Sequence, residues 1–121
     1  MKNKKTLVMG ASLKPIRYSN MAIERLVSND MDVVAFGLRK GVVSGVEIDT
    51  TLIPYENIHT VTLYLNPTRQ KEYYDYIITL NPERVIFNPG TENPEFYALL
   101  KENDIFYETA CTLVLLSTNQ Y

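Results

Sequence analysis

Cysteine is nearly absent from this chain: Cys111 is the only one among 121 residues, so no disulfide can form within the chain. A single thiol is typical of a reducing compartment, and we expect a cytoplasmic protein. Long apolar runs are missing as well, since no stretch approaches the roughly 20 apolar residues that a membrane helix requires. The apolar run after the basic residues 2–5 is too short for a signal peptide. We therefore expect no membrane partner.

Net charge is also small, because 12 basic and 14 acidic side chains leave a formal charge of −2. Such a chain has no overall positive field to attract nucleic acid, and no basic groove accompanies its tyrosines. Any site for an anion must be local. The single histidine, His59, lies at the start of an apolar run, at the end of a predicted strand where active sites are not found. We assign no catalytic residue and no metal ligand.

Apolar, β-branched runs alternate with helical patterns along the whole chain, which indicates parallel strands joined by helices. The length suits one domain, residues 1–121. Five strands are predicted, at Lys5–Gly10, Val33–Phe36, His59–Leu65, Arg84–Asn88 and Ile105–Thr109. The segment 46–54 is expected to be a short extended excursion without a helix. The pattern predicts an α/β fold, a Rossmann-like open parallel sheet of about five strands in the order 3-2-1-4-5, with helices on both faces.

The predicted helices have recognisable starts. Ser19 or Asn20 can cap the first helix through a side-chain oxygen. Asn66-Pro67 and Asn93-Pro94 each place a capping residue before a proline at the first helical position. A short closing helix is predicted over Cys111–Leu116.

The segment between the first strand and the first helix is the most informative part of the chain. In doubly wound sheets, backbone N–H groups and the positive end of the helix dipole hold phosphates there. Compared with the fingerprint G-x-G-x-x-G, Gly10 fills the first glycine position, Ser12 the second and Pro15 the third. A serine hydroxyl can donate to a phosphate oxygen, and Lys14 and Arg17 add positive charge. This segment is therefore expected to hold phosphate with an altered geometry.

The end of the second strand lacks the acid that NAD-binding proteins use to hold the ribose diol. Gly37 and Leu38 are followed there by two cations, Arg39 and Lys40. Positive charge at this position favours a ribose that carries a phosphate, as in NADP or in the 3′-phospho-ADP end of coenzyme A. The alternative is that both cations are solvated loop charges.

These segments together resemble the small stand-alone CoA-binding-domain family. That family is similar to the nucleotide-binding domain of succinyl-CoA synthetase α subunits and of ADP-forming acyl-CoA synthetases. The resemblance rests on residues 8–20, on Lys40-Gly41 with Gly45, and on residues 86–94, and it covers essentially the whole chain. It implies a Rossmann-like domain that binds CoA through its nucleotide moiety. It does not imply synthetase chemistry, because the synthetases act through a phosphorylated histidine on another domain.

One departure from the family is clear, since its members usually end the second strand with Asn-Pro and this chain has Phe36-Gly37-Leu38. We expect CoA or an acyl-CoA as the ligand of a non-catalytic binding or regulatory module, with its phosphates neutralised by Lys14, Arg17, Arg39 and Lys40. The expected contacts lie in the loops after the strands and at the start of the first helix: Gly10, Ala11, Ser12, Lys14, Pro15, Arg17, Tyr18, Ser19, Asn20, Gly37, Arg39, Lys40, Tyr64, Asn88, Pro89 and Gly90.

Two other function classes stay open. The chain could be an enzyme, either an NADP-linked oxidoreductase or an acyl-transfer enzyme that uses Cys111 at a helix N-terminus. Glu92 and Glu95 are candidate acids or bases near the predicted pocket, although carboxylates also favour helix starts for electrostatic reasons. The chain could instead be a Rossmann domain kept for protein contacts. Exposed aromatic surface from Tyr73, Tyr74 and Tyr76 would support a homodimer, and amphipathic tyrosines with solvated hydroxyls are the alternative.

Overall fold

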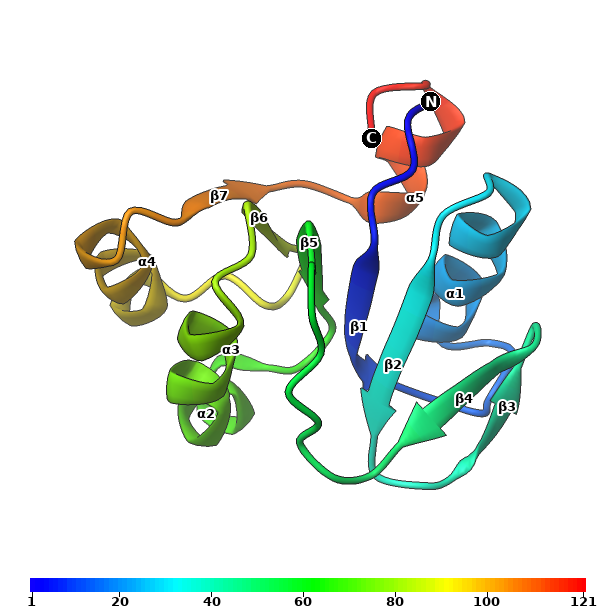
Figure 1. Ribbon diagram of the computed structural model, residues 1–121, viewed down its shortest axis with the longest axis horizontal. Coiled ribbons are helices and arrows are strands. Elements are labelled where there is room, and N and C mark those ends of the chain that lie inside the picture. The colour runs from blue at the N-terminus through cyan, green and yellow to red at the C-terminus, as the bar shows by residue number, and fades with distance from the viewer.

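Seven strands form one sheet in the computed structural model, which describes residues 1–121. Their order is β3-β4-β2-β1-β5-β6-β7, and all neighbours are parallel except the β3–β4 hairpin. The strands are β1 (Thr6–Ala11), β2 (Val33–Gly37), β3 (Gly41–Val43), β4 (Val46–Asp49), β5 (Thr60–Leu63), β6 (Arg84–Phe87) and β7 (Phe106–Thr109). The helices are α1 (Tyr18–Ser28), α2 (Pro67–Gln70), a 3₁₀ turn η1 (Lys71–Tyr73), α3 (Tyr74–Leu80), α4 (Pro94–Glu102) and α5 (Thr112–Ser117). Helices α1 and α5 lie on one face of the sheet, and α2, α3 and α4 on the other (Figure 1).

The expected α/β class with a mostly parallel sheet is confirmed, but the expected strand order is wrong. The third predicted strand, now β5, pairs with β1 and not with β2. The place beside β2 is taken by β4, from the segment 46–54 that is expected to be a short extended excursion without a helix and was not counted among the five strands. The connection 50–59 returns past β1, where the His59 and Thr60 N–H groups both donate to the Lys5 carbonyl, at 2.9 and 3.1 Å. Chain order therefore reverses between β1 and β5.

Both faces of the central strand are buried, as expected for a parallel sheet covered by helices. On β1, Leu7 and Met9 belong to a cluster beneath α2, α3 and α4, whereas Val8 belongs to a second cluster beneath α1 and α5. This alternation follows from the two-residue period of a strand. The sheet is therefore held from both sides, and only its two ends are free to form a site.

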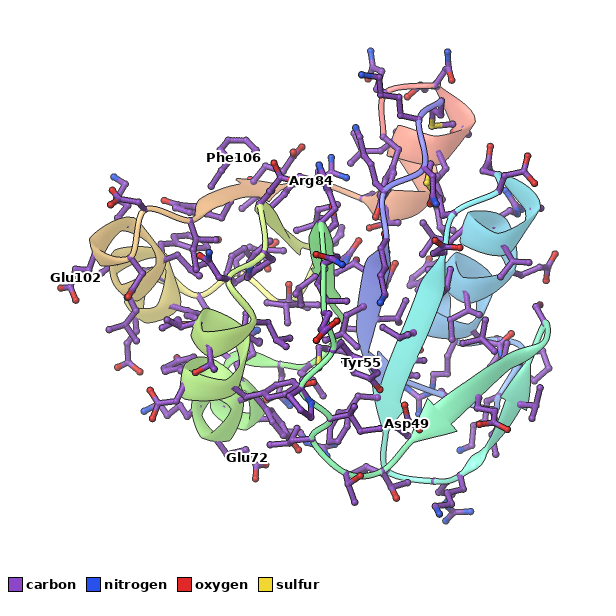
Figure 2. All side chains as sticks on the ribbon, viewed as in Figure 1. Asp49, Tyr55, Glu72, Arg84, Glu102 and Phe106 are labelled. Carbon is purple, nitrogen blue, oxygen red and sulfur yellow. The ribbon has the colours of Figure 1, made fainter.

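The tyrosines of the 67–80 segment do not form the exposed aromatic surface that we expected. Tyr73 and Tyr74 are buried in the larger core cluster, and the Tyr76 hydroxyl donates to the Ile53 carbonyl at 2.5 Å. Asp49 accepts a hydrogen bond from the Tyr55 hydroxyl, which ties the same connection to β4 (Figure 2). The homodimer stays a prediction, without this support.

Two of the three expected helix caps are confirmed. Asn66 Oδ1 accepts from the Arg69 N–H at 2.9 Å, and Asn93 Oδ1 accepts from the Phe96 N–H at 3.3 Å. The expectation for α1 is wrong, because Arg17 occupies the N-cap position without a side-chain cap, and Ser19 and Asn20 lie buried inside the first turn. The Asn20 amide is used elsewhere, as described below.

The amino end of the sheet is closed by a polar cluster around Arg84. This buried guanidinium donates to Thr60 Oγ1 at 3.1 Å and to the Tyr121 carbonyl at 3.0 Å, and it lies 4.4 Å from the centre of the Tyr121 ring. Lys4 Nζ donates to the same carbonyl at 2.6 Å. Figure 2 shows Arg84 at the end of the sheet opposite the arrowheads of β1 and β2 in Figure 1.

Candidate ligand-binding cleft

A cleft of about 440 Å³ lies at the carboxyl ends of β1, β2 and β5, where the chain order reverses. Open α/β sheets bind ligands at this position. The cleft is lined by four basic side chains and by no Asp or Glu. Its lining residues are Gly10, Ala11, Ser12, Leu13, Lys14, Arg17, Phe36, Gly37, Leu38, Arg39, Tyr64, Leu65, Arg69 and Tyr73. The arrangement suits an anion of a size typical for cofactor pockets.

Two glycines allow the strand ends to approach closely at the floor of the cleft. Gly10 has a φ of +93° at an irregularity of β1, and a Cβ there would lie 3.1 Å from the Tyr64 carbonyl carbon and oxygen. At Gly37, a Cβ would lie 2.4 Å from the Ala11 carbonyl oxygen, which no real side chain tolerates. The glycine that stands where the family usually has Asn-Pro therefore lets β1 and β2 stay paired up to the cleft.

The loop between β1 and α1 is held in place by its own polar groups. Ser12 Oγ accepts the Lys14 N–H at 3.1 Å, which leaves the Ser12 hydroxyl proton available to a ligand. The Asn20 side-chain amide donates to the Ser12 carbonyl at 2.9 Å, and this bond positions the loop on the helix.

The start of α1 differs from the starts of α2 and α4. Both of the latter are capped by an asparagine side chain, whereas no side chain caps α1. The first N–H groups of a helix need an outside partner, and an anion supplies one that the helix dipole also favours. An uncapped N-terminus of an eleven-residue helix beside an acid-free cleft suits a phosphate group.

The cleft cations have no ion-pair partners within the protein. The three ion pairs of the chain are His59–Glu83, Lys71–Glu95 and Arg84–Glu108. Lys14, Arg17, Arg39 and Arg69 take part in none of them. In a chain with a net charge of −2, four unpaired cations in one cleft form a local positive site.

The structure brings one part of the predicted site together and leaves the rest outside. The cleft lining includes Gly10, Ala11, Ser12, Lys14, Arg17, Gly37, Arg39 and Tyr64. Outside the lining lie Pro15, Tyr18, Ser19, Asn20, Lys40, Asn88, Pro89 and Gly90. The residues outside the lining fall into three groups. Some belong to the first turn of α1 and some to the loops after β1 and β2. The others follow β6, which is one strand further from the reversal point.

Asn88 has a structural role at the end of β6. Its amide donates to Thr62 Oγ1 at 2.7 Å and to the Leu63 carbonyl at 2.9 Å, and its oxygen accepts the Thr112 N–H at 2.9 Å. Only 2 % of the residue is exposed. The asparagine therefore joins β5, β6 and α5 and has no free donor for a ligand.

Tyr64 is neutral in the folded protein at ordinary pH. Burial raises the pKa of its hydroxyl to about 12, although hydrogen bonds with the Thr112 and Thr62 hydroxyls act in the opposite direction. The hydroxyl is therefore engaged by threonines outside the cleft lining and is not a base for a ligand in the cleft.

Six lining residues were not among the predicted contacts: Leu13, Phe36, Leu38, Leu65, Arg69 and Tyr73. Four of them are apolar and belong to the same loops as predicted residues, so the convergence of loops could have indicated them. Arg69 and Tyr73 are different, because they lie within the helical segment after β5. Their helical spacing of four residues indicates only a shared face and gives no sign that this face borders the cleft.

The candidates for catalysis lie elsewhere. Cys111 is the N-cap residue of α5, Glu92 Oε1 accepts the Gly90 N–H at 2.8 Å, and Glu95 Oε1 accepts from the Tyr74 hydroxyl at 3.1 Å. His59 lies next to Glu83 at the amino end of the sheet. None of these residues lines the cleft.

A second hollow, of about 470 Å³, lies between residues 52–57 and α3, and its lining contains Glu56 but no cation. No group of His, Cys, Asp and Glu side chains is placed to hold a metal ion. No helix of the protein is both long and apolar enough to cross a lipid bilayer. The acid-free cleft is therefore the candidate site that suits an anion.

Comparison with known proteins shows the family and the fold of the chain. Residues 4–117 match the sequence profile of the family described as CoA binding domain. An uncharacterised protein with a known crystal structure is 45% identical in sequence, with a TM-score of 0.97 and full coverage of both chains. A Thermus thermophilus protein is 20% identical with a TM-score of 0.86, over 98% of this chain and 91% of that one. A hypothetical protein from Pyrococcus horikoshii is 25% identical with a TM-score of 0.80, over 94% and 82%. No curated protein sequence matches the chain.

Proposed function

Because the chain belongs to the CoA-binding domain family, we propose that its cleft binds coenzyme A or an acyl-CoA through the 3′-phospho-ADP moiety. The domain acts as a non-catalytic binding or regulatory module. The observation that carries the proposal is the set of four unpaired cations in an acid-free cleft at the reversal point of the sheet. A ligand with a diphosphate and a further ribose phosphate neutralises such a set.

Each part of the ligand has a matching part of the cleft. The diphosphate lies over Gly10 and Ser12, near the uncapped N-terminus of α1, whose dipole favours an anion. The adenosine lies towards β2, the side on which doubly wound folds place it. Leu13 and Leu38 contact the adenine there, and Arg39 binds the 3′-phosphate. The non-catalytic role is supported by the position of Cys111, Glu92, Glu95 and His59, the residues considered for catalysis, all outside the cleft lining.

Arg39 replaces Lys40 as the residue that we assign to the 3′-phosphate. The resemblance to the larger synthetases implied Lys40, but this side chain lies outside the cleft lining, whereas its neighbour Arg39 lines it. The two residues are adjacent cations on one loop, so each is a matched control for the other.

Calorimetric titration of the wild-type protein and of Arg39→Ala and Lys40→Ala tests this proposal. The wild type should bind CoA more tightly than dephospho-CoA by about tenfold or more, the value of one charge-assisted contact. Arg39→Ala should bring this ratio close to one, and Lys40→Ala should leave it nearly unchanged. If Arg39→Ala keeps the wild-type ratio of CoA to dephospho-CoA affinity, another group binds the 3′-phosphate.

The same titrations separate the other function classes. Tighter binding of NADP than of CoA would favour the oxidoreductase alternative. Binding of NAD as tightly as CoA would contradict recognition of a ribose phosphate. Binding of none of these nucleotides would favour a domain kept for protein contacts.

A further inference from the structure

Arg69 is the one cation of the cleft that comes from the β5 side of the sheet. Its backbone is held firmly, because its N–H is accepted by the capping oxygen of Asn66 at 2.9 Å. The next residue, Gln70, is fully buried, and its amide donates to the Leu65 and Thr91 carbonyls, both at 2.8 Å. The main chain beneath the Arg69 side chain is therefore fixed before any ligand arrives.

The Arg69 side chain lines the cleft together with a packed aromatic pair. Tyr73, one helical turn further on, is buried, and its ring meets the Phe36 ring edge-to-face at 5.3 Å. All three side chains line the cleft. The guanidinium is partly buried and forms neither an ion pair nor a side-chain hydrogen bond within the protein. Glu72, three residues along the chain, does not pair with it. This arginine has a fixed main chain, a partly buried side chain and no partner within the protein. It is therefore suited to bind an anion from outside the protein.

The position of Arg69 decides which anion it takes. The adenosine side of the cleft is the β2 side, and Arg69 comes from β5, across β1 from it. Between the two sides lie Gly10 and Ser12, over which the diphosphate lies. We propose that Arg69 binds the ligand diphosphate from the β5 side, opposite Lys14 and Arg17 of the β1–α1 loop. The diphosphate is then held between the two halves of the sheet, and not by the loop alone.

This inference rests on the proposed function only in requiring a ligand with a diphosphate. It holds equally for CoA, dephospho-CoA, ADP and NADP. The 3′-phosphate is left to Arg39, so the two arginines have separable effects: one sets affinity for every diphosphate, and the other sets the preference for a phosphorylated ribose.

Titration of Arg69→Gln with CoA, dephospho-CoA, ADP and inorganic pyrophosphate tests the inference. Binding of all four should weaken by a similar factor of about tenfold, while the ratio of CoA to dephospho-CoA affinity stays at its wild-type value. Arg69→Lys should recover only part of the loss, because a lysine lacks the two-pronged geometry that suits a diphosphate. Lys71→Gln is the matched control: this exposed cation lies two residues away outside the cleft, and its removal should leave all four affinities unchanged.

Three results for the Arg69 variants would overturn the inference. A collapse of the CoA to dephospho-CoA ratio in Arg69→Gln would assign this residue to the 3′-phosphate. Unchanged affinities in a variant whose thermal melting matches wild type would make Arg69 a solvated surface cation. A loss of affinity only for an acyl-CoA whose acyl group carries a carboxylate would show that Arg69 binds the acyl end of the ligand. If the wild type binds ADP and CoA equally well, the proposed function fails. The inference on Arg69 is still tested in that case, by the loss of ADP affinity in Arg69→Gln.

Discussion

Arg84 at the amino end of the sheet and Arg39 at the carboxyl end are both arginines at a strand terminus, in opposite surroundings. Arg84 is buried, donates to Thr60 and Tyr121, and pairs with Glu108 at 3.6 Å. Arg39 is exposed and shares an acid-free cleft with three other cations. At the amino end the positive charge is bonded to other parts of the chain. At the carboxyl end the positive charges have no partner within the protein.

The difference has an energetic meaning. A buried charge is tolerated when partners replace its water, and for Arg84 the Thr60 hydroxyl and the Tyr121 carbonyl accept from Nε and Nη1, whereas Nη2 is buried without a hydrogen-bond partner. Cations without partners repel one another and add nothing to stability, so the four of them in one cleft agree with the anionic ligand proposed above. The two ends should therefore respond differently to substitution, with stability changing at one end and affinity at the other.

The largest effect is expected for Arg84→Ala. Removing this side chain leaves the Tyr121 carbonyl with one donor fewer, removes the contact with the Tyr121 ring and opens a gap in a buried cluster. The free energy of unfolding should fall by about 3 kcal/mol, measured by urea denaturation. Affinity for CoA, measured on the folded fraction, should not change.

Lys101→Ala is the control for the loss of a positive charge, because Lys101 is exposed and takes part in no ion pair. Its unfolding free energy should stay within about 0.5 kcal/mol of the wild-type value. A tenfold loss of CoA affinity in Arg84→Ala would contradict the comparison, since it would couple the two ends.

A smaller effect is expected for Gly10→Ala, compared with Gly90→Ala. Both glycines have nearly the same φ, +93° and +91°, so an alanine is strained at either position. A Cβ at Gly10 also meets the Tyr64 backbone at 3.1 Å, whereas a Cβ at Gly90 meets nothing within 4 Å. Each variant should lose about 1 kcal/mol of stability from strain, with a further ~1 kcal/mol at Gly10 from crowding.

Ligand binding gives the second measurement on this pair. Gly10 lies at the floor of the cleft and Gly90 outside it, so only Gly10→Ala should weaken CoA binding in calorimetry. Equal CoA affinities in the two variants would show that the floor of the cleft does not contact the ligand.

The sequence predicted the parts of the fold that depend on local signals. The Asn66 and Asn93 caps, the strand at Arg84 and the break between strand and helix at Gly10 all follow from neighbouring residues. In the candidate site, the loops after β1 and β2 were predicted for the same reason.

The remainder depends on contacts between distant segments. The side of β1 on which β5 pairs is decided by the connection 50–59 and the two bonds to the Lys5 carbonyl, which no local pattern contains. The same mistake in strand order directed attention to Asn88, at the end of β6, and away from Arg69, which follows β5. Asn88 could not be recognised as structural without its partners Thr62 and Thr112.

The smallest effect is expected from pH, and it too separates the two ends. Burial lowers the pKa of His59 below its ordinary value of 6.5, although the Glu83 carboxylate raises it in part. Above pH 6.5 the imidazole is neutral in both states, and its contribution to stability is complete. As pH falls below 6.5, the unfolded chain takes up a proton that the folded protein still resists, so stability decreases towards the lowered pKa.

Urea denaturation of the wild type and of His59→Gln between pH 7.5 and 5.5 measures this effect. The variant should lose less stability than the wild type over this interval, and Glu83→Gln should lose more, because His59 then lacks the charge that favours its protonated form. Equal slopes in the wild type and His59→Gln would assign the pH dependence to other groups. His59 lies at the amino end of the sheet and does not line the cleft, so this pH effect weakens the amino end and not the cleft.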